Sequence, residues 1–340
     1  MKKAAITALL LSLAVLGTWE YYARSKGYIA SIDDDKALWA VRRAKLDGLS
    51  SKDIVVLGSS RAHFDLQLDQ WEGETGVRPL MLACDGSTPT PVFQDIVNNS
   101  DFNGTVLIGV TPGLFFSKPS EKSSPWRRSK TRIDFYLDRT YAQRLNHILS
   151  APLKKTFAFL NASEESWDDD IDLKSLINRI HIGNRLGPPD PPFYRFQVVD
   201  NERNVTMLDK VEDDTAFAAT IQRVWTFFGK NAPPPVKDTI LDIYKDLIAK
   251  FKARGGRVVF VRFPSAGGFR KAENKVLPRE HYWDVLLEQT GCPGYHFEDY
   301  PQLSKYFPPE WSHLYTPDAK TFTRDLAAIM LQDGAITKIR

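Results

Sequence analysis

Four short apolar runs, separated by longer amphipathic stretches, set the pattern of the chain. Each run has the length of a buried strand and is followed by turn-forming residues such as glycine, serine or proline. The stretches between and after the runs have helical spacing, most clearly at 33–46, 91–97 and 236–253 and in a C-terminal segment that ends near residue 331. Short buried strands that alternate with helices predict an α/β fold with a doubly wound parallel sheet, whose sites lie at the carboxyl ends of the strands. The four runs cover residues 53–57, 80–84, 105–110 and 257–263.

The middle of the chain breaks this rhythm. It contains helical patches at 139–150 and 217–228, an acidic run at 168–172, and proline clusters at 188–192 and 233–235. The acidic run lacks the glycine and the terminal glutamate of an EF-hand loop, which favours a solvated helix start over a calcium loop. We therefore predict a mainly helical insertion or cap between two parts of one domain. The predicted segments are 1–27 (anchor), 28–116 (first part of the domain), 117–235 (insertion) and 236–340 (second part).

The N-terminus predicts export and membrane attachment. Lys2 and Lys3 precede an uncharged run at 4–19, and aromatic residues at 19–22 suit a membrane interface. An uncleaved signal anchor is favoured, because no clean small-residue cleavage site appears; a cleaved signal peptide with a weak site near 15–17 is the alternative. The expected location is the inner membrane, single-pass, with the main domain on the periplasmic side.

Composition narrows the classes of partner. The 340 residues are 43% hydrophobic, which is enough for a sizeable core. The 45 Lys and Arg residues are nearly balanced by 42 Asp and Glu residues, so the chain has no strong positive electrostatic field of the kind that attracts nucleic acid. Cys84 and Cys292 stand far apart without metal-binding or redox spacing, so we expect no metal and no cofactor. Export would permit a disulfide between them, and two separate buried thiols are the other reading.

Two short segments suggest chemistry. Ser60 follows the first apolar run and Gly58, a position that presents a hydroxyl at the sheet edge, although a serine there is often only a helix cap. Near the other end of the chain, Glu310 stands three residues before His313, a spacing that lets the carboxylate fix the imidazole tautomer. A lone surface histidine near a helix start is the alternative for the second segment.

The order of these segments resembles the SGNH (GDSL-like) family of serine esterases and acyltransferases. The family's four blocks match residues 58–60, 85–87, 109–112 and 310–313, and the likeness covers about 50–116 and 256–332. The resemblance implies Ser60 as nucleophile, His313 as general base and Glu310 as orienting acid. It also implies the backbone N–H groups of Ser60 and Gly86 as oxyanion donors.

Two positions depart from the family pattern. Thr111 or Pro112 stands where the family has an asparagine that donates to the oxyanion, and such a donor is worth about 3 to 4 kcal/mol in the transition state. Glu310 replaces the usual aspartate, which keeps the charge but changes its reach. The second departure leaves the triad chemistry possible, whereas the first predicts a slow enzyme or one with an unusual acyl group.

The anchored layout resembles the AlgJ/AlgX and DltD-like branch of the family. That likeness implies a hydrolase or O-acyltransferase with an acyl-serine intermediate, acting on acylated envelope glycans or related esters beside a membrane-bound O-acyltransferase. Arg61, Arg262 and Trp311 are candidate substrate contacts, with ordinary packing as the alternative for each. A non-catalytic binding or scaffold partner of a membrane acyltransferase is the other functional class, favoured by the missing asparagine. If the catalytic reading holds, Ser60 Oγ and the His313 imidazole should lie about 2.6 to 4 Å apart.

Overall fold

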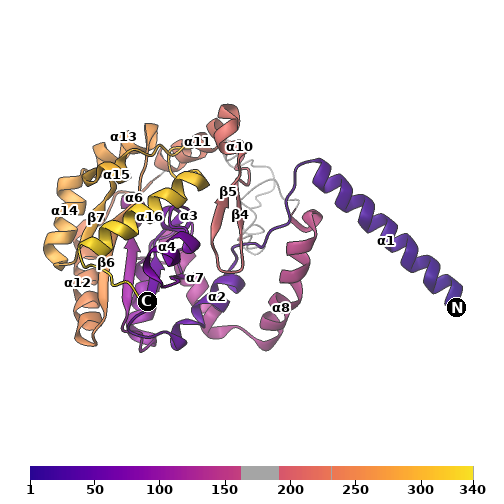
Figure 1. Cartoon of the computed structure of the whole chain (residues 1–340), viewed down its shortest axis with the longest axis horizontal. Helices are drawn as coiled ribbons and strands as arrows, with labels where there is room; N and C mark the ends of the chain where they lie inside the picture. The colour runs from indigo at the N-terminus through magenta and orange to yellow at the C-terminus, as the bar shows by residue number, and fades with distance from the viewer. Residues whose placement is uncertain (162–190, 231, 340) are drawn as a thin grey trace, which may run out of the picture.

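Five parallel strands form the central sheet in the computed structural model, which describes residues 1–161, 191–230 and 232–339 (Figure 1). The strands lie in the order β2-β1-β3-β6-β7, so the chain moves to one edge and then crosses back past its first strand. All four predicted apolar runs contribute strands to this sheet, which confirms the α/β class. β7 was not predicted. The strands are β1 (Ile54–Leu57), β2 (Leu80–Met81), β3 (Thr105–Gly109), β6 (Arg257–Arg262) and β7 (Gly294–His296).

Alternate side chains of each strand enter two apolar cores, one on each face of the sheet. In β1, Val55 and Leu57 enter the first core, whereas Ile54 and Val56 enter the second. The first core is covered by helices α2 (Lys36–Arg43), α5 (Thr90–Asn99), α7 (Ser124–Asp138), α12 (Lys237–Ala253) and α14 (Arg279–Thr290). The second is covered by α3 (Ser60–Asp65), α4 (Leu68–Thr75) and the long α16 (Thr316–Gln332), which crosses the sheet in yellow in Figure 1.

The predicted helices of the core are present with shifted ends. α2 begins at Lys36 and not at Asp33, because the Asp35 side chain caps it and accepts from the N–H groups of Ala37 and Leu38 at 2.9 and 2.8 Å. Shorter elements complete this part of the chain. They are η1 (Leu46–Gly48), α6 (Pro112–Phe115), α13 (Gly267–Val276), η4 (Phe297–Asp299) and α15 (Pro301–Ser304).

The segment 117–235 contains a two-stranded antiparallel hairpin as well as helices. Residues of the hairpin and of α11 pack with Phe64 of α3 in a third apolar cluster. This part of the chain therefore lies against α3, the helix that follows β1. The acidic run 168–172 and part of the first proline cluster lie outside the described residues. Besides α7, the described elements of this segment are α8 (Tyr141–Thr156), η2 (Ala158–Asn161), β4 (Gln197–Val199), β5 (Val205–Met207), α10 (Lys210–Asp213) and α11 (Thr215–Lys230).

The N-terminal helix α1 (Lys2–Ser25) projects away from the sheet and its layers (Figure 1). Its apolar window is exposed along its whole length, and within the described chain it is the one helix long and apolar enough to cross a membrane. A signal sequence has the same properties, so length and composition leave the choice between anchor and cleaved peptide open.

Cys84 and Cys292 are both buried and both free. Of the two readings from the sequence, separate buried thiols therefore hold in this structure. Burial raises the pKa of the Cys84 thiol to about 11, which keeps it protonated and unreactive at neutral pH.

Candidate active site

Ser60 is the first residue of α3 and is half-buried at the carboxyl end of β1. Its neighbour Ser59 occupies the cap position of the helix, yet no side chain caps the helix, and the Ser59 hydroxyl instead lies 2.6 Å from that of Thr111. The simple capping role that a serine often has at this place is thus absent for both serines.

Gly58 lets the chain turn from β1 into α3 while its backbone lies close to Ala62 and Gly109. Its φ of 150° lies in the region that favours glycine, and a Cβ there would stand 2.6 Å from that of Ala62 and 3.2 Å from the Cα of Gly109. A side chain at residue 58 would therefore push the start of α3, and Ser60 with it, away from the sheet edge.

Glu310 and His313 form a buried pair in the loop before α16. The Nδ1 of His313 lies 3.0 Å from Oε1 of Glu310, and the two residues are 1% and 0% exposed. The same oxygen accepts the backbone N–H groups of Ser312 and His313, and the other accepts the indole N–H of Trp225. With both its oxygens occupied, the carboxylate is fixed in place, and it favours the imidazole tautomer that carries its proton on Nδ1.

The other ring nitrogen of His313 is free. Among the described residues, Nε2 is buried and has no hydrogen-bond partner, so it is not bonded to Ser60 Oγ in this structure. The expected separation of about 2.6 to 4 Å between the two side chains stays a prediction. A histidine with Nδ1 held by a carboxylate and Nε2 unoccupied has the arrangement of a general base awaiting a proton donor.

Contacts along α3 hold this helix against the His313 loop. The Arg61 guanidinium lies 3.3 Å from the Ser312 hydroxyl, and Asp65 Oδ1 accepts the N–H of Leu314 at 2.8 Å. Between them, the Phe64 ring stacks on the His313 ring with centroids 4.3 Å apart. Because residues four apart lie on the same face of a helix, Ser60 lies one turn from Phe64, on the face of α3 that carries this ring.

The two predicted oxyanion donors have free N–H groups. Neither Ser60 nor Gly86 donates a backbone hydrogen bond to another described residue, and Gly86 is exposed with a φ of 62°. Thr111, which stands in place of the family's asparagine, has its hydroxyl engaged with Ser59, and Pro112 has no N–H to offer. The arrangement thus provides two potential donors and no clear third.

Arg61 and Arg262 are fully buried, at 0% and 1% exposure, and share the carboxylate of Glu273. The two positive charges outweigh the cost of burial and lower the pKa of Glu273 to about 2. Both guanidinium groups therefore have a structural partner and no surface open to a dissolved substrate, which leaves their predicted substrate contacts without support.

Trp311 is half-exposed and is held by backbone geometry. Its φ is 79°, unusual for a bulky residue, and its carbonyl accepts the N–H of Ala266 at 2.9 Å. The indole packs directly over Gly267 and Gly268, where a Cβ would stand 2.3 and 3.0 Å from its ring atoms. Of the three predicted substrate contacts, Trp311 is the one with an accessible surface.

The insertion supplies residues that the sequence did not mark as part of the site. The Phe196 and Trp225 rings lie 5.9 and 5.7 Å from the His313 ring, and the Trp225 indole also binds Glu310. No local spacing could have revealed them, since they stand far from the 310–313 block in the sequence. Their only signal was their aromatic character in a segment that breaks the strand and helix rhythm.

Asp65 is a second buried carboxyl group at this place. Burial, together with the nearby charge of Glu310, raises its pKa well above the usual range, although Arg61 and the Leu314 N–H oppose the shift. Its Oδ2 has no hydrogen-bond partner among the described residues. Asp65 therefore holds its proton more strongly than an exposed aspartate does, and its bond to the Leu314 N–H joins α3 to the His313 loop.

One further polar cluster has the composition of a metal site. Ligand atoms of Asp34, His63 and Asp85 lie within 4.8 Å of one another. However, His63 binds Asp85 through Nδ1 at 2.9 Å and the carbonyl of Arg203 through Nε2 at 2.8 Å, while the Arg203 guanidinium binds both oxygens of Asp34. The Arg203 charge holds the pKa of Asp34 well below its usual range despite burial. The Arg203 guanidinium already supplies to the Asp34 carboxylate the positive charge that a metal ion would give it. The cluster is therefore better described as an ion-pair network that joins the β4-β5 hairpin to the edge of the sheet than as a metal site.

Comparisons with known proteins leave the family of the chain as an expectation from its motifs. The sequence matches no protein-family model, and no curated protein gives a significant match.

Proposed function

We propose that this protein is a serine-dependent ester hydrolase or O-acyltransferase that acts on acylated cell-envelope glycans or related esters. The observation that carries the proposal is the His313 side chain, held at Nδ1 by Glu310, free at Nε2 and stacked on Phe64, which lies one helical turn along α3 from Ser60. A histidine that served only for packing would gain from a partner at each buried nitrogen, since an unsatisfied buried polar atom costs about 1 to 3 kcal/mol.

The proposed mechanism is double displacement. His313 Nε2 takes the hydroxyl proton as Ser60 Oγ attacks the ester carbonyl, and Glu310 stabilises the imidazolium that forms. The imidazolium returns its proton to the leaving oxygen, which departs and leaves an acyl-serine. Water, or a sugar hydroxyl in a transferase, then attacks this ester with His313 again as base, and the serine is regenerated.

Two backbone N–H groups, those of Ser60 and Gly86, would bind the oxyanion. The Thr111 hydroxyl would have to leave Ser59 to join them. Because each donor contributes about 3 to 4 kcal/mol, a two-donor site predicts slow turnover of simple esters compared with a complete family member.

The apolar helix α1 supports a proposal about where the protein acts. We propose that α1 anchors the protein in the inner membrane with the sheet domain on the periplasmic side, where a membrane-bound O-acyltransferase would be its partner. In that arrangement the domain would receive or remove acyl groups on glycans that pass the membrane surface.

A pair of adjacent serines provides the test. Ser60→Ala should abolish turnover of small aryl esters with little change in the melting temperature. Ser59→Ala is the matched control: it loses a hydroxyl pair with Thr111, worth about 1 kcal/mol of stability, and should remain active. Wild-type turnover in both variants would contradict the proposal.

One observation favours the second functional class, a non-catalytic scaffold for a membrane acyltransferase. His313 is 1% exposed and is packed against the Phe64, Phe196 and Trp225 rings, so Nε2 has no surface open to a dissolved substrate in this structure. For a scaffold, neither serine variant changes ester turnover, because the wild-type protein has none.

A further inference from the structure

Helix α8 turns its polar side toward the protein. The half-buried residues of α8 are His147, Ser150, Ala151 and Lys154, which lie on one face by their spacing, and no residue of the helix is fully buried. Lys154 pairs with Asp33 at 2.5 Å on this inner side. The polarity of the helix is thus opposite to that of an ordinary surface helix, whose apolar side faces the core.

The opposite side of α8, here called its outer face, is apolar and open. Exposed large apolar side chains recur along it at helical spacing, and they are exposed by two fifths or more. An exposed apolar stripe of this length marks a contact with an apolar partner. The residues are Tyr141 (81%), Leu145 (42%), Ile148 (64%), Leu149 (62%) and Leu153 (51%).

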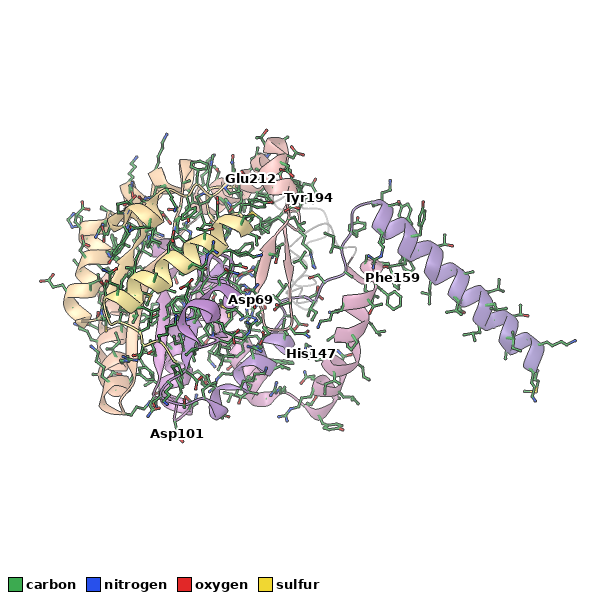
Figure 2. The ribbon with its side chains drawn as sticks, viewed as in Figure 1. Asp69, Asp101, His147, Phe159, Tyr194 and Glu212 are labelled. Atoms are coloured by element: carbon green, nitrogen blue, oxygen red, sulfur yellow. The ribbon has the colours of Figure 1, made fainter. Side chains whose placement is uncertain are left out.

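The C-terminal end of α8 is fixed to the end of α1. Phe159, in the turn after α8, stacks on Trp19 of α1 with ring centroids 5.1 Å apart. Figure 2 labels Phe159 between the end of α8 and α1. Glu20 accepts the N–H groups of Ala158 and Phe159 at 3.0 and 3.1 Å. α8 therefore ends at the level at which the apolar run of α1 ends, which is the level of a membrane interface if α1 spans the bilayer.

Positive charge borders the outer face. Arg144 and Lys155 are exposed and lie on the same edge of the helix, next to Ile148. An apolar stripe bordered by basic side chains is the pattern of a helix that lies in the interface of a membrane with anionic lipids.

We propose that the outer face of α8 lies in the headgroup and acyl boundary of the phospholipid bilayer that α1 enters. α8 would then form a second attachment, which stops the domain from swinging about the end of α1 and fixes the orientation of its site above the membrane. This inference rests on the membrane-spanning role of α1 in the proposed function, and it is independent of the Ser60 chemistry.

The test uses the full chain in vesicles of phosphatidylcholine and phosphatidylglycerol, with one nitroxide label on an introduced cysteine. The native cysteines are buried, so labelling is selective for the introduced one. The label at Leu149→Cys reports on the outer face, Leu13→Cys on α1, and Lys250→Cys on an exposed position of α12. We expect the Leu149 label, like the Leu13 label, to collide readily with oxygen and little with a water-soluble nickel complex, whereas the Lys250 label does the reverse.

Two results would overturn the inference. A Leu149 label as open to nickel as the Lys250 label would place α8 in water. A Leu149 label shielded from both reagents and broadened by a second label would show that another copy of the chain covers the outer face. In either case a lipid-exposed Leu13 label would leave the anchor intact, so failure of this inference can be told from failure of the anchor.

Discussion

Replacing Glu310 with glutamine tests how the carboxylate holds His313. Glu310 accepts N–H groups only: Oε1 takes three, from Ser312 and from the backbone and ring of His313, and Oε2 takes one, from Trp225. Glutamine keeps one oxygen and replaces the other with an NH₂ group, which cannot accept. The oxygen should stay on the side with three donors, so the NH₂ group must face the Trp225 indole.

The magnitudes follow from this geometry. The indole N–H of Trp225 loses its acceptor, and a partly buried donor without a partner costs about 1 to 3 kcal/mol of unfolding free energy. At the site, a neutral amide oxygen replaces a charged one behind His313, a difference of about 1 to 2 kcal/mol that slows acylation about 10-fold or somewhat more. Had the NH₂ group faced His313, the wrong tautomer would be favoured, and the loss would approach about 10⁴-fold.

Trp225→Phe separates the two effects. Phenylalanine removes the opposing N–H, so the double variant Glu310→Gln, Trp225→Phe should be more stable than the sum of the single changes by about 1 to 2 kcal/mol. Urea unfolding of the four proteins gives the stability cycle, and the rate of labelling by a fluorophosphonate probe gives the effect on the site. Additive stability changes together with an unchanged labelling rate in Glu310→Gln would refute this account of the carboxylate.

Three further outcomes follow from the structure. Glu273→Gln should cost about 3 to 5 kcal/mol in urea unfolding, because Arg61 and Arg262 would stay buried without a counter-charge; a loss below about 1 kcal/mol would contradict this. The raised pKa of Asp65 means that the folded form keeps its proton to a higher pH than the unfolded form, so stability falls by up to about 1.4 kcal/mol per pH unit as the pH rises from the usual pKa to the raised one. Asp65→Asn lacks that slope, so its stability relative to wild type should improve as the pH rises above the usual aspartate pKa, and parallel curves would argue against a raised pKa. A chain that begins at Tyr28 should be soluble and show a folded circular dichroism spectrum, and aggregation without such a signal would contradict the domain boundary.

The sheet could be predicted from the sequence where a strand is buried on both faces. β1, β3 and β6 are continuous apolar runs bounded by turn residues, so length and composition were sufficient. β7 and the β4-β5 hairpin have only three residues in each strand, and such segments gain their structure from the strand they pair with and not from their own pattern.

In the site, too, contacts between residues close in the sequence could be predicted, whereas contacts between distant segments could not. The contact of Glu310 with His313 could be predicted because both residues belong to one turn of chain. The Trp225 bond to Glu310 and the Phe64 stack on His313 depend on how three distant segments pack, which no spacing in the sequence encodes. The burial of Arg61 also could not be foreseen, because an arginine at a sheet edge is far more often exposed.

The most direct test of the central claim is to locate a covalent adduct. The folded wild-type protein is treated with a fluorophosphonate, and the modified peptide is fragmented in a mass spectrometer to distinguish Ser60 from Ser59. The account predicts one phosphonyl group on Ser60, its loss in Ser60→Ala and its slower formation in Glu310→Gln. A protein that takes up no phosphonate, or one that carries it elsewhere and keeps it in Ser60→Ala, would contradict the assignment of Ser60 as the nucleophile.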